Sequence, residues 1–242
     1  MQGNAAANNL NPKLCPYKGS YPSKLSDLEA KNIIHDYVAN IGFPCVGAKT
    51  ALAKDQIEIC VADSIFSSHN DDDILKGLYR FIAEYQKDKA IFRSFIVVFC
   101  DELDINDEDF ESALWTRLQS LNDKDIFPWD ASVSQNPEDK TFSFSAGNKA
   151  FYIVGMHPGS SRKARRFPLP ALVFNMHEQF EQLRASGQYQ KMRSLIRRRD
   201  EAFSGSSNPM LEDFGDNSEA VQYSGRQISG EWKCPFHNKG IN

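Results

Sequence analysis

The sequence predicts a single α/β domain, of the α+β kind, with a central mixed β-sheet flanked by helices and followed by a long irregular C-terminal segment. The continuous apolar run Phe95–Cys100 is typical of a strand that is buried on both faces. Residues 74–85 and 107–121 carry apolar side chains at helical spacing, which predicts amphipathic helices against the sheet. Gly147-Asn148, between two apolar runs, predicts a hairpin and therefore an antiparallel part of the sheet.

The first helix is expected to begin at Ser26, because Ser26 and Glu29 have the spacing of a capping box. It extends to about Asn40. Asn70 and the three aspartates after it mark the start of another helix, where the helix dipole favours negative charge, so we do not interpret them as a metal site. The other elements expected are strands at 57–61, 141–145, 150–154 and 171–174, and helices at 177–185 and 189–202.

The two ends of the chain lack this periodicity. Residues 1–23 are polar and predict a flexible arm, so the folded domain is expected to span residues 24–242. Residues 42–49 come after the first helix and are expected to form a compact turn. From Gly205 onward, Gly, Ser, Asn, Pro and acidic residues dominate, and a long irregular segment of this kind is often functional.

The composition is that of an ordinary globular protein, with 41% hydrophobic and 25% charged residues among 242. There is no apolar run of about 18 residues and no signal-peptide pattern, which argues against a membrane partner and predicts a cytoplasmic protein. The five cysteines form no CxxC pair, so they do not indicate a zinc site and are expected to be free thiols.

Positive charge is concentrated in one part of the chain. The net charge is −4, yet between His157 and Arg199 ten lysines and arginines face only Glu178 and Glu181, which gives this segment a charge of +8. A general nucleic-acid binder is more often basic overall, so this pattern favours a specific anion over nucleic acid. A phosphate or nucleic-acid binder that uses the same arginines remains an alternative.

The stretch from Gly155 to Phe167 is the centre of that charge. It follows the apolar run Phe151–Val154 and combines His157 with glycines, serines and four cations. Turn amides and guanidinium groups after a strand can converge on the oxygen atoms of one anion. The other interpretation is a solvated basic loop.

A second informative stretch surrounds Cys45, in Phe43-Pro-Cys-Val-Gly47. A cysteine in a turn, with glycine two residues later, leaves backbone amides open around the sulfur. Such amides stabilise the thiolate that a haem iron or an electrophile requires. An ordinary buried cysteine in a turn is the alternative.

Taken together, six ordered stretches from about residue 20 to the end resemble the YqcI/YcgG family. A set of six in order is much more specific than any one alone. The stretches are Phe43-Pro-Cys-Val-Gly-Ala-Lys49, His157-Pro-Gly-Ser-Ser-Arg-Lys-Ala-Arg-Arg-Phe167, Ala171-Leu-Val-Phe-Asn-Met-His-Glu-Gln-Phe180, Asn208-Pro-Met-Leu-Glu-Asp-Phe-Gly215, Gln222-Tyr-Ser-Gly-Arg226 and Trp232-Lys-Cys-Pro-Phe236.

The resemblance implies a protein that binds haem b and hydroxylates a guanidine nitrogen of arginine or an arginine-derived compound, in natural-product biosynthesis. Its partners would be a small guanidino substrate and O₂ with a reductant, or peroxide. The haem propionates would bind the cluster of Ser160, Ser161, Arg162, Arg165 and Arg166.

Under this resemblance Cys45 is the first choice for the axial ligand, because a thiolate favours O–O cleavage. The rival ligands are His157, His177 and Cys234. The activity could also be that of a haem oxygenase or peroxygenase on another small amine, or that of a haem sensor or carrier without turnover.

A guanidinium substrate would require a carboxylate and an aromatic wall. The irregular C-terminal segment offers both, and Glu219 is favoured over Asp213 as the carboxylate, with Tyr223 as the aromatic group. A solvated acidic turn is the alternative interpretation of this segment.

Overall fold

A computed structural model describes residues 25–100, 104–206 and 215–238. The predicted arm, residues 1–23, lies outside the described residues, and so does Asp213. The strands are β1 (Ile57–Ala62), β2 (Ser94–Phe99), β3 (Phe144–Ala146), β4 (Lys149–Met156) and β5 (Ala171–Met176). The α-helices are α1 (Asp27–Ala39), α2 (Val46–Ala53), α3 (Asp71–Asp88), α4 (Asp107–Lys124), α5 (His177–Ala185) and α6 (Tyr189–Ser204).

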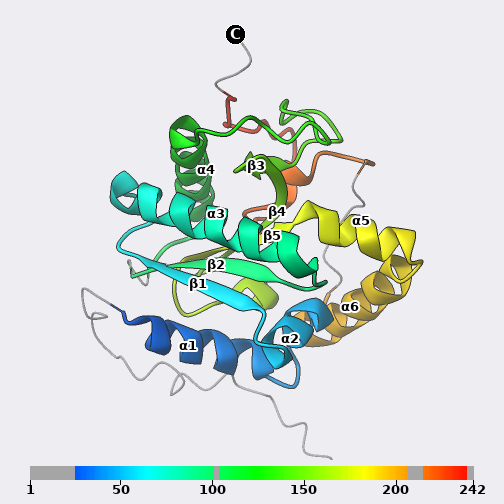
Figure 1. The fold of residues 1–242 in the computed structure, drawn as a ribbon. Helices are drawn as coiled ribbons and strands as arrows, with labels where there is room; N and C mark the ends of the chain where they lie inside the picture. The colour runs from blue at the N-terminus through cyan, green and yellow to red at the C-terminus, as the bar shows by residue number, and fades with distance from the viewer. Residues whose placement is uncertain (1–24, 101–103, 207–214, 239–242) are drawn as a thin grey trace, which may run out of the picture.

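The five strands form one mixed sheet in the order β1-β2-β5-β4-β3, which confirms the predicted fold class (Figure 1). β1 and β2 are parallel, whereas the β2–β5, β5–β4 and β4–β3 pairs are antiparallel. The predicted hairpin joins β3 to β4, and its two turn residues Gly147 and Asn148 both have positive φ angles of 60° and 57°. That conformation matches the twist of the strands it connects.

Helices α3 and α4 cover one face of the sheet, and α1 and α2 cover the other (Figure 1). The α3–α4 side holds the larger core, which is rich in phenylalanine and includes Phe81, Phe95, Phe110 and Phe174. On the α1 side, Ile34 and Val38 pack against sheet residues such as Ile96. Alternate residues of β2 therefore enter the two cores, and this explains its continuous apolar run.

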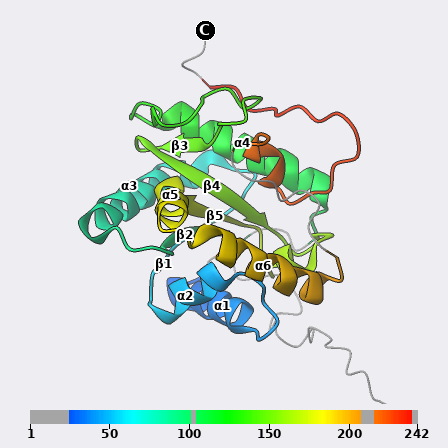
Figure 2. The same ribbon diagram turned by 90° about the vertical axis from the view of Figure 1, so that its right-hand side faces the viewer.

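The last two helices and the C-terminal segment complete the domain. α5 begins directly where β5 ends, and α6 returns beside α2 on the α1 side of the sheet (Figure 2). The short 3₁₀-helix η4 (Glu219–Gln222) leads into Tyr223, whose carbonyl accepts a 2.8 Å hydrogen bond from the amide of Gly155 on β4. The C-terminal segment thus pairs with the end of β4, beyond the residues that pair with β3.

The structure confirms the predicted start of α1 and corrects the expectation for the residues that follow this helix. The capping box of Ser26 and Glu29 is present and confirms the start of α1. The compact turn expected at 42–49 is wrong in its second half, because Val46 already begins α2. An eight-residue helix with three alanines and a glycine has no apolar stripe of its own, so hydrophobic periodicity could not reveal it. Within the described residues, no helix is both long and apolar enough to cross a membrane.

Candidate functional site

A cavity of about 330 Å³ lies between the sheet and helices α1, α2, α5 and α6. Apolar side chains from the sheet and the helices form most of its wall. Five of the residues selected from the sequence also line it, although they come from separate parts of the chain: Cys45, Arg162, Arg165, His177 and Glu219. A mainly apolar cavity with a few convergent polar groups is the usual form of a small-molecule site.

Cys45 is the N-cap residue of α2, so its sulfur lies at the start of that helix. The amide of Ala48 donates to Sγ at 3.4 Å. Burial raises the pKa of the Cys45 thiol, and the amides of Ala48 and Gly47 together with Arg165 oppose that rise. The helix start therefore offers the sulfur the amides that a thiolate requires, inside an otherwise desolvating cavity.

Phe92 covers the helix start beside Cys45. Its backbone has a φ of 76°, which is unfavourable for a bulky residue. A Cβ atom added to Gly47 would lie 3.2 Å from Phe92 Cδ1 and 3.8 Å from Cys45 Sγ. Gly47 thus allows the aromatic ring to approach α2 closely, and the Cys-x-Gly pattern has a packing reason in addition to its open amides.

His177 is the first residue of α5 and is 7% exposed. Its Nε2 lies 3.9 Å from Oε1 of Glu181, one turn later in the helix. Burial lowers the pKa of His177, with Glu181 opposing the shift. The imidazole is therefore held toward its neutral form, which is the form that binds a metal.

Glu219 is a buried carboxyl group in the cavity wall, 4% exposed. Its Oε1 accepts hydrogen bonds from the hydroxyls of Ser143 at 2.6 Å and Tyr223 at 2.5 Å. Both of these hydrogen bonds are to Oε1, and none to Oε2 is found among the described residues. Burial raises the pKa of Glu219 to about 7. One carboxyl oxygen is thus anchored, and the other remains available to a ligand.

The arginines of the basic turn are bound to the protein itself. Arg162 forms a buried ion pair with Asp200 of α6. Arg165 donates to the carbonyls of Gly155 at 2.8 Å, Tyr223 at 3.1 Å and Gln222 at 3.1 Å. These guanidinium groups reach the cavity wall, and they also hold the turn, α6 and the C-terminal segment together.

The remaining polar groups of the turn are similarly engaged. Arg166 Nε donates to the carbonyl of Ser160 at 2.6 Å, and its Nη2 donates to that of Ser161 at 3.1 Å. The amide of Ser161 donates to Oδ2 of Asp107 at 3.2 Å, and the Ser160 hydroxyl accepts from the amide of Arg162 at 3.3 Å. The carboxylate that this turn receives is therefore one of the protein's own, Asp107 at the start of α4.

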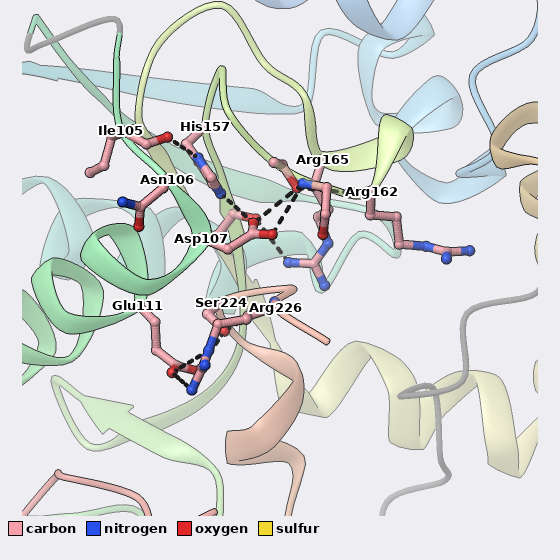
Figure 3. Close-up of polar contacts among 12 residues, drawn as sticks. Ile105, Asn106, Asp107, Glu111, His157, Arg162, Arg165, Ser224 and Arg226 are labelled. Atoms are coloured by element: carbon pink, nitrogen blue, oxygen red, sulfur yellow. Dashed lines mark hydrogen bonds and ion pairs between the residues drawn. The ribbon is translucent and has the colours of Figure 1, made fainter. Parts of the chain in front are cut away.

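His157 lies beside that carboxylate and does not line the cavity (Figure 3). Its Nδ1 is 3.2 Å from the carbonyl of Ile105, and its Nε2 is 3.0 Å from Oδ1 of Asp107. The ring is fully buried and stacks on Phe110 at a centroid distance of 4.3 Å. Burial lowers the pKa of His157, although Asp107 opposes the shift. Both ring nitrogens have protein partners, which is the arrangement of a structural histidine.

The other predicted residues lie away from the cavity. Tyr223 is fully buried, and its hydroxyl also accepts from the amide of Phe144 at 3.0 Å. It therefore fixes the position of the Glu219 carboxyl group and does not line the cavity. Cys234 is buried in the α3–α4 core near Phe236, and burial raises its pKa to about 12. Arg226 and Ser224 bind Glu111 of α4, which anchors the C-terminal segment (Figure 3).

The sequence did not identify α6 as a wall of the site. Met192, Arg193, Ile196 and Arg197 of this helix line the cavity. Their i, i+1, i+4, i+5 spacing marks one helix face, and this pattern could have been found in the sequence. The three consecutive arginines at 197–199 do point apart, as expected: the second is exposed, and the third donates to the carbonyls of residues 41 and 43.

Within the described ranges there is no group of three or more His, Cys, Asp or Glu side chains that could hold a metal ion. A site in which the protein supplies several metal ligands finds no support in this part of the chain. A single axial ligand to a metal held by a macrocycle does not require such a group.

Comparison with known proteins gives the family. The model of the YqcI/YcgG family matches residues 34–237, and the chain belongs to this family. No curated protein and no solved structure matches the chain. The matched range contains every residue that lines the cavity.

Proposed function

We propose that this member of the YqcI/YcgG family binds haem b in the cavity and hydroxylates a guanidine nitrogen of arginine or an arginine-derived compound. The observation that carries the proposal is the placement of Cys45 at the start of α2, where its sulfur accepts amide hydrogen bonds and faces an apolar cavity. This is the environment in which a cysteine serves as a thiolate ligand.

The cavity is lined by the kinds of residue that a haem site requires. Its walls are mainly apolar, Cys45 and His177 are the two candidate axial ligands, and arginines are among the lining residues. Its volume, about 330 Å³, lies at the lower end of the range of roughly 300–1,000 Å³ for ligand pockets. Bound thiolate-ligated haem would supply the oxygen chemistry, with O₂ and a reductant or with peroxide.

Cys45 is favoured over His177 because its helix start is built around the sulfur. The amides at the N-terminus of α2 stabilise negative charge on the sulfur and oppose the effect of burial, which favours the thiol. Burial raises the pKa of the uncoordinated thiol, so proton loss would accompany ligation of a metal.

Glu219 is the residue we propose to bind the guanidino group. A guanidinium ion can donate to the available Oε2 while Ser143 and Tyr223 hold Oε1 in place. A cation at this position would lower the pKa of the carboxyl from its raised value near 7, so the carboxylate would form as substrate binds. The surrounding apolar wall would exclude water from the pair.

The first test is the absorption spectrum of the purified protein after addition of hemin, recorded as the reduced CO complex. We expect a band at the position of thiolate-ligated haem, and Cys45→Ser should abolish it while Cys60→Ser, a half-buried thiol outside the cavity, leaves it unchanged. A protein that takes up no hemin would overturn the cofactor. Loss of the band in His177→Ala or Cys234→Ser, with Cys45→Ser unaffected, would overturn the ligand.

The second test addresses the substrate. Mass spectrometry should detect a gain of one oxygen on arginine or another guanidine when the loaded protein is supplied with reductant and O₂ or with peroxide. Glu219→Gln should weaken guanidine binding and leave the CO band unchanged. Oxygen gain on a different amine alone would support an oxygenase or peroxygenase of another substrate, and no gain on any amine would support a haem sensor or carrier.

A further inference from the structure

A series of four aromatic rings, the aromatic chain, leads from the cavity wall through the core. Tyr152 of β4 lines the cavity, and the edge of its ring meets the ring of Tyr223 at a centroid distance of 5.8 Å. Tyr223 in turn stacks on Trp115 of α4 at 5.5 Å. Trp115 lies 6.1 Å from Trp232 in the C-terminal segment. All three distances are those of rings in direct contact, so the chain is continuous.

The two ends of the aromatic chain lie in different surroundings. Tyr152 and Trp232 are half-buried, whereas Tyr223 and Trp115 between them are buried. Trp232 lines a groove together with Glu138 and Lys233, both of which are exposed. The four rings therefore connect the cavity to the surface of the protein through the α3–α4 core.

The kinds of ring in this chain matter, because tyrosine and tryptophan lose one electron far more readily than phenylalanine. Tyr37 also lines the cavity, but its ring contacts among the described residues are with phenylalanines only. The same holds for Trp129, a tryptophan of the same core. The aromatic chain is thus a series of oxidisable rings, and these two rings do not extend it.

Two polar features of the chain suit the movement of charge. The hydroxyl of Tyr223 donates to Oε1 of Glu219 at 2.5 Å, so the phenol proton has a carboxyl oxygen as its acceptor. Nε1 of Trp115 is buried and has no hydrogen-bond partner among the described residues, a feature that costs stability and has no structural benefit here. An indole without an acceptor keeps its proton when it is oxidised, and it therefore passes the charge on.

We propose that the aromatic chain conducts single oxidising equivalents from the cavity to the surface and so protects the site when no substrate consumes the oxidant. The inference rests on the proposed function for that oxidant, which is peroxide cleaved in the cavity. The free oxygen Oε2 of Glu219, proposed above to bind the guanidino group, takes no part in the chain.

Each transfer moves one electron inward along the chain, from Trp232 to Tyr152 and from there into the cavity. A one-electron reductant of the ascorbate type restores Trp232 at the surface. The proton of Tyr223 moves to the ionised carboxyl group of Glu219 when the ring is oxidised, and it returns when Trp115 reduces the ring. Two transfers, with two protons from solvent, complete the reduction of one hydrogen peroxide to two waters.

The first arm of the test uses the full chain without haem. Azidyl radicals made by pulse radiolysis oxidise indole rings, and absorption then follows the indole and phenoxyl radicals. Wild type should convert indole into phenoxyl radical in a first-order step that is independent of protein concentration, because Tyr223 has an acceptor for its proton. Trp115→Phe should abolish this step. Trp129→Phe, the matched change outside the chain, should leave it unchanged.

A second variant keeps this arm decisive if Trp115→Phe fails to fold. Trp232→Phe interrupts the chain at its half-buried end and should also abolish the step. An intact step in either of these variants, or the lack of such a step in wild type, overturns the proposal.

The second arm uses the hemin-loaded chain with hydrogen peroxide and ascorbate, without a guanidine, and records the loss of haem absorption. Trp115→Phe and Trp232→Phe should lose this absorption faster than wild type, and Trp129→Phe should match wild type. Equal rates in all four proteins overturn the proposal and leave the cofactor standing. If wild type binds no hemin but shows the radical conversion, the proposed function falls while the conducting chain is supported.

Discussion

Arg162 and Asp200 form a buried ion pair that joins the basic turn to helix α6, with side-chain exposures of 5% and 6%. Arg162 Nη2 also donates to the carbonyl of Ser206 at 3.1 Å, and the Ser204 hydroxyl donates to Oδ1 of Asp200 at 3.0 Å. Asp200 is the one buried residue of α6, and Arg199 adds hydrogen bonds from this helix to the carbonyls of residues 41 and 43. The ion pair is thus the buried part of the attachment that holds this wall of the cavity.

Removal of either partner should be strongly destabilising. Asp200→Ala leaves the Arg162 guanidinium buried without its carboxylate, which typically costs about 3–5 kcal/mol of unfolding free energy. The double variant Arg162→Ala/Asp200→Ala should cost less than the sum of the two single changes, because it buries no unpaired charge. Urea unfolding of the three variants measures these differences. Glu201→Ala, an exposed change on the same helix, is the control, and an equal cost for Asp200→Ala and Glu201→Ala would contradict the role of the pair.

The raised pKa of Glu219 predicts a pH-dependent contribution to stability. Between the unfolded value of 4.5 and the folded value of about 7, the folded protein retains a proton that the unfolded chain has lost. Stability from this group is therefore present below pH 4.5 and is lost as the pH rises through 7, by about 3 kcal/mol at most.

The measurement is the difference in unfolding free energy between Glu219→Gln and wild type, taken at pH 5 and pH 8. The variant should gain on wild type by up to about 3 kcal/mol over this range, because its amide cannot ionise. The difference cancels the contributions of the histidines, which titrate in both proteins. Glu201→Gln, on the exposed face of α6, should show no such change. A constant difference for Glu219→Gln would show that its carboxyl is ionised in the fold.

Gly159 shows why the basic turn is shaped as it is. A Cβ atom at this position would lie 2.1 Å from the carbonyl oxygen of Ile105, a backbone atom that cannot move aside. Gly159→Ala should therefore destabilise the protein by about 3 kcal/mol or more. Gly205→Ala, at the left-handed end of α6 with open space around it, should cost only about 1–2 kcal/mol. Thermal unfolding of both variants compares these costs, and near-equality would mean that the turn can separate from Ile105.

The fold was largely predictable because its strongest elements carry unambiguous patterns. The run Phe95–Cys100 is apolar throughout since β2 lies between β1 and β5 and is covered on both faces, and the stripe on α3 faces a core that contains Phe81 and Tyr85. α2 escaped prediction because its only buried residue is Ala51. The position of α2 is nevertheless important for the candidate site, because it makes Cys45 the N-cap residue of a helix and not a residue in a turn.

Some residues of the candidate site could be selected from the sequence, but their arrangement and the contribution of α6 could not. Cys45, His177 and Glu219 do line one cavity, and their distance along the chain gave no indication of that proximity. The basic turn was selected because of its positive charge. The sequence pattern cannot show which carboxylates the tertiary structure places next to these arginines. Asp107 and Asp200 come from helices α4 and α6, and only the tertiary structure places them against Ser161 and Arg162.

The two histidines selected from the sequence should now behave differently. His157→Asn should lower stability by about 1–3 kcal/mol, because it removes a fully buried imidazole that pairs with the half-buried Asp107 carboxylate. Hemin affinity and the CO band should be unchanged, since His157 lies outside the cavity. His177→Asn should have the opposite profile, with a small effect on stability and a change in hemin binding, because His177 lines the cavity wall. Urea unfolding and hemin titration on both variants separate the two roles. A loss of the haem spectrum in His157→Asn at unchanged stability would instead make that histidine a ligand.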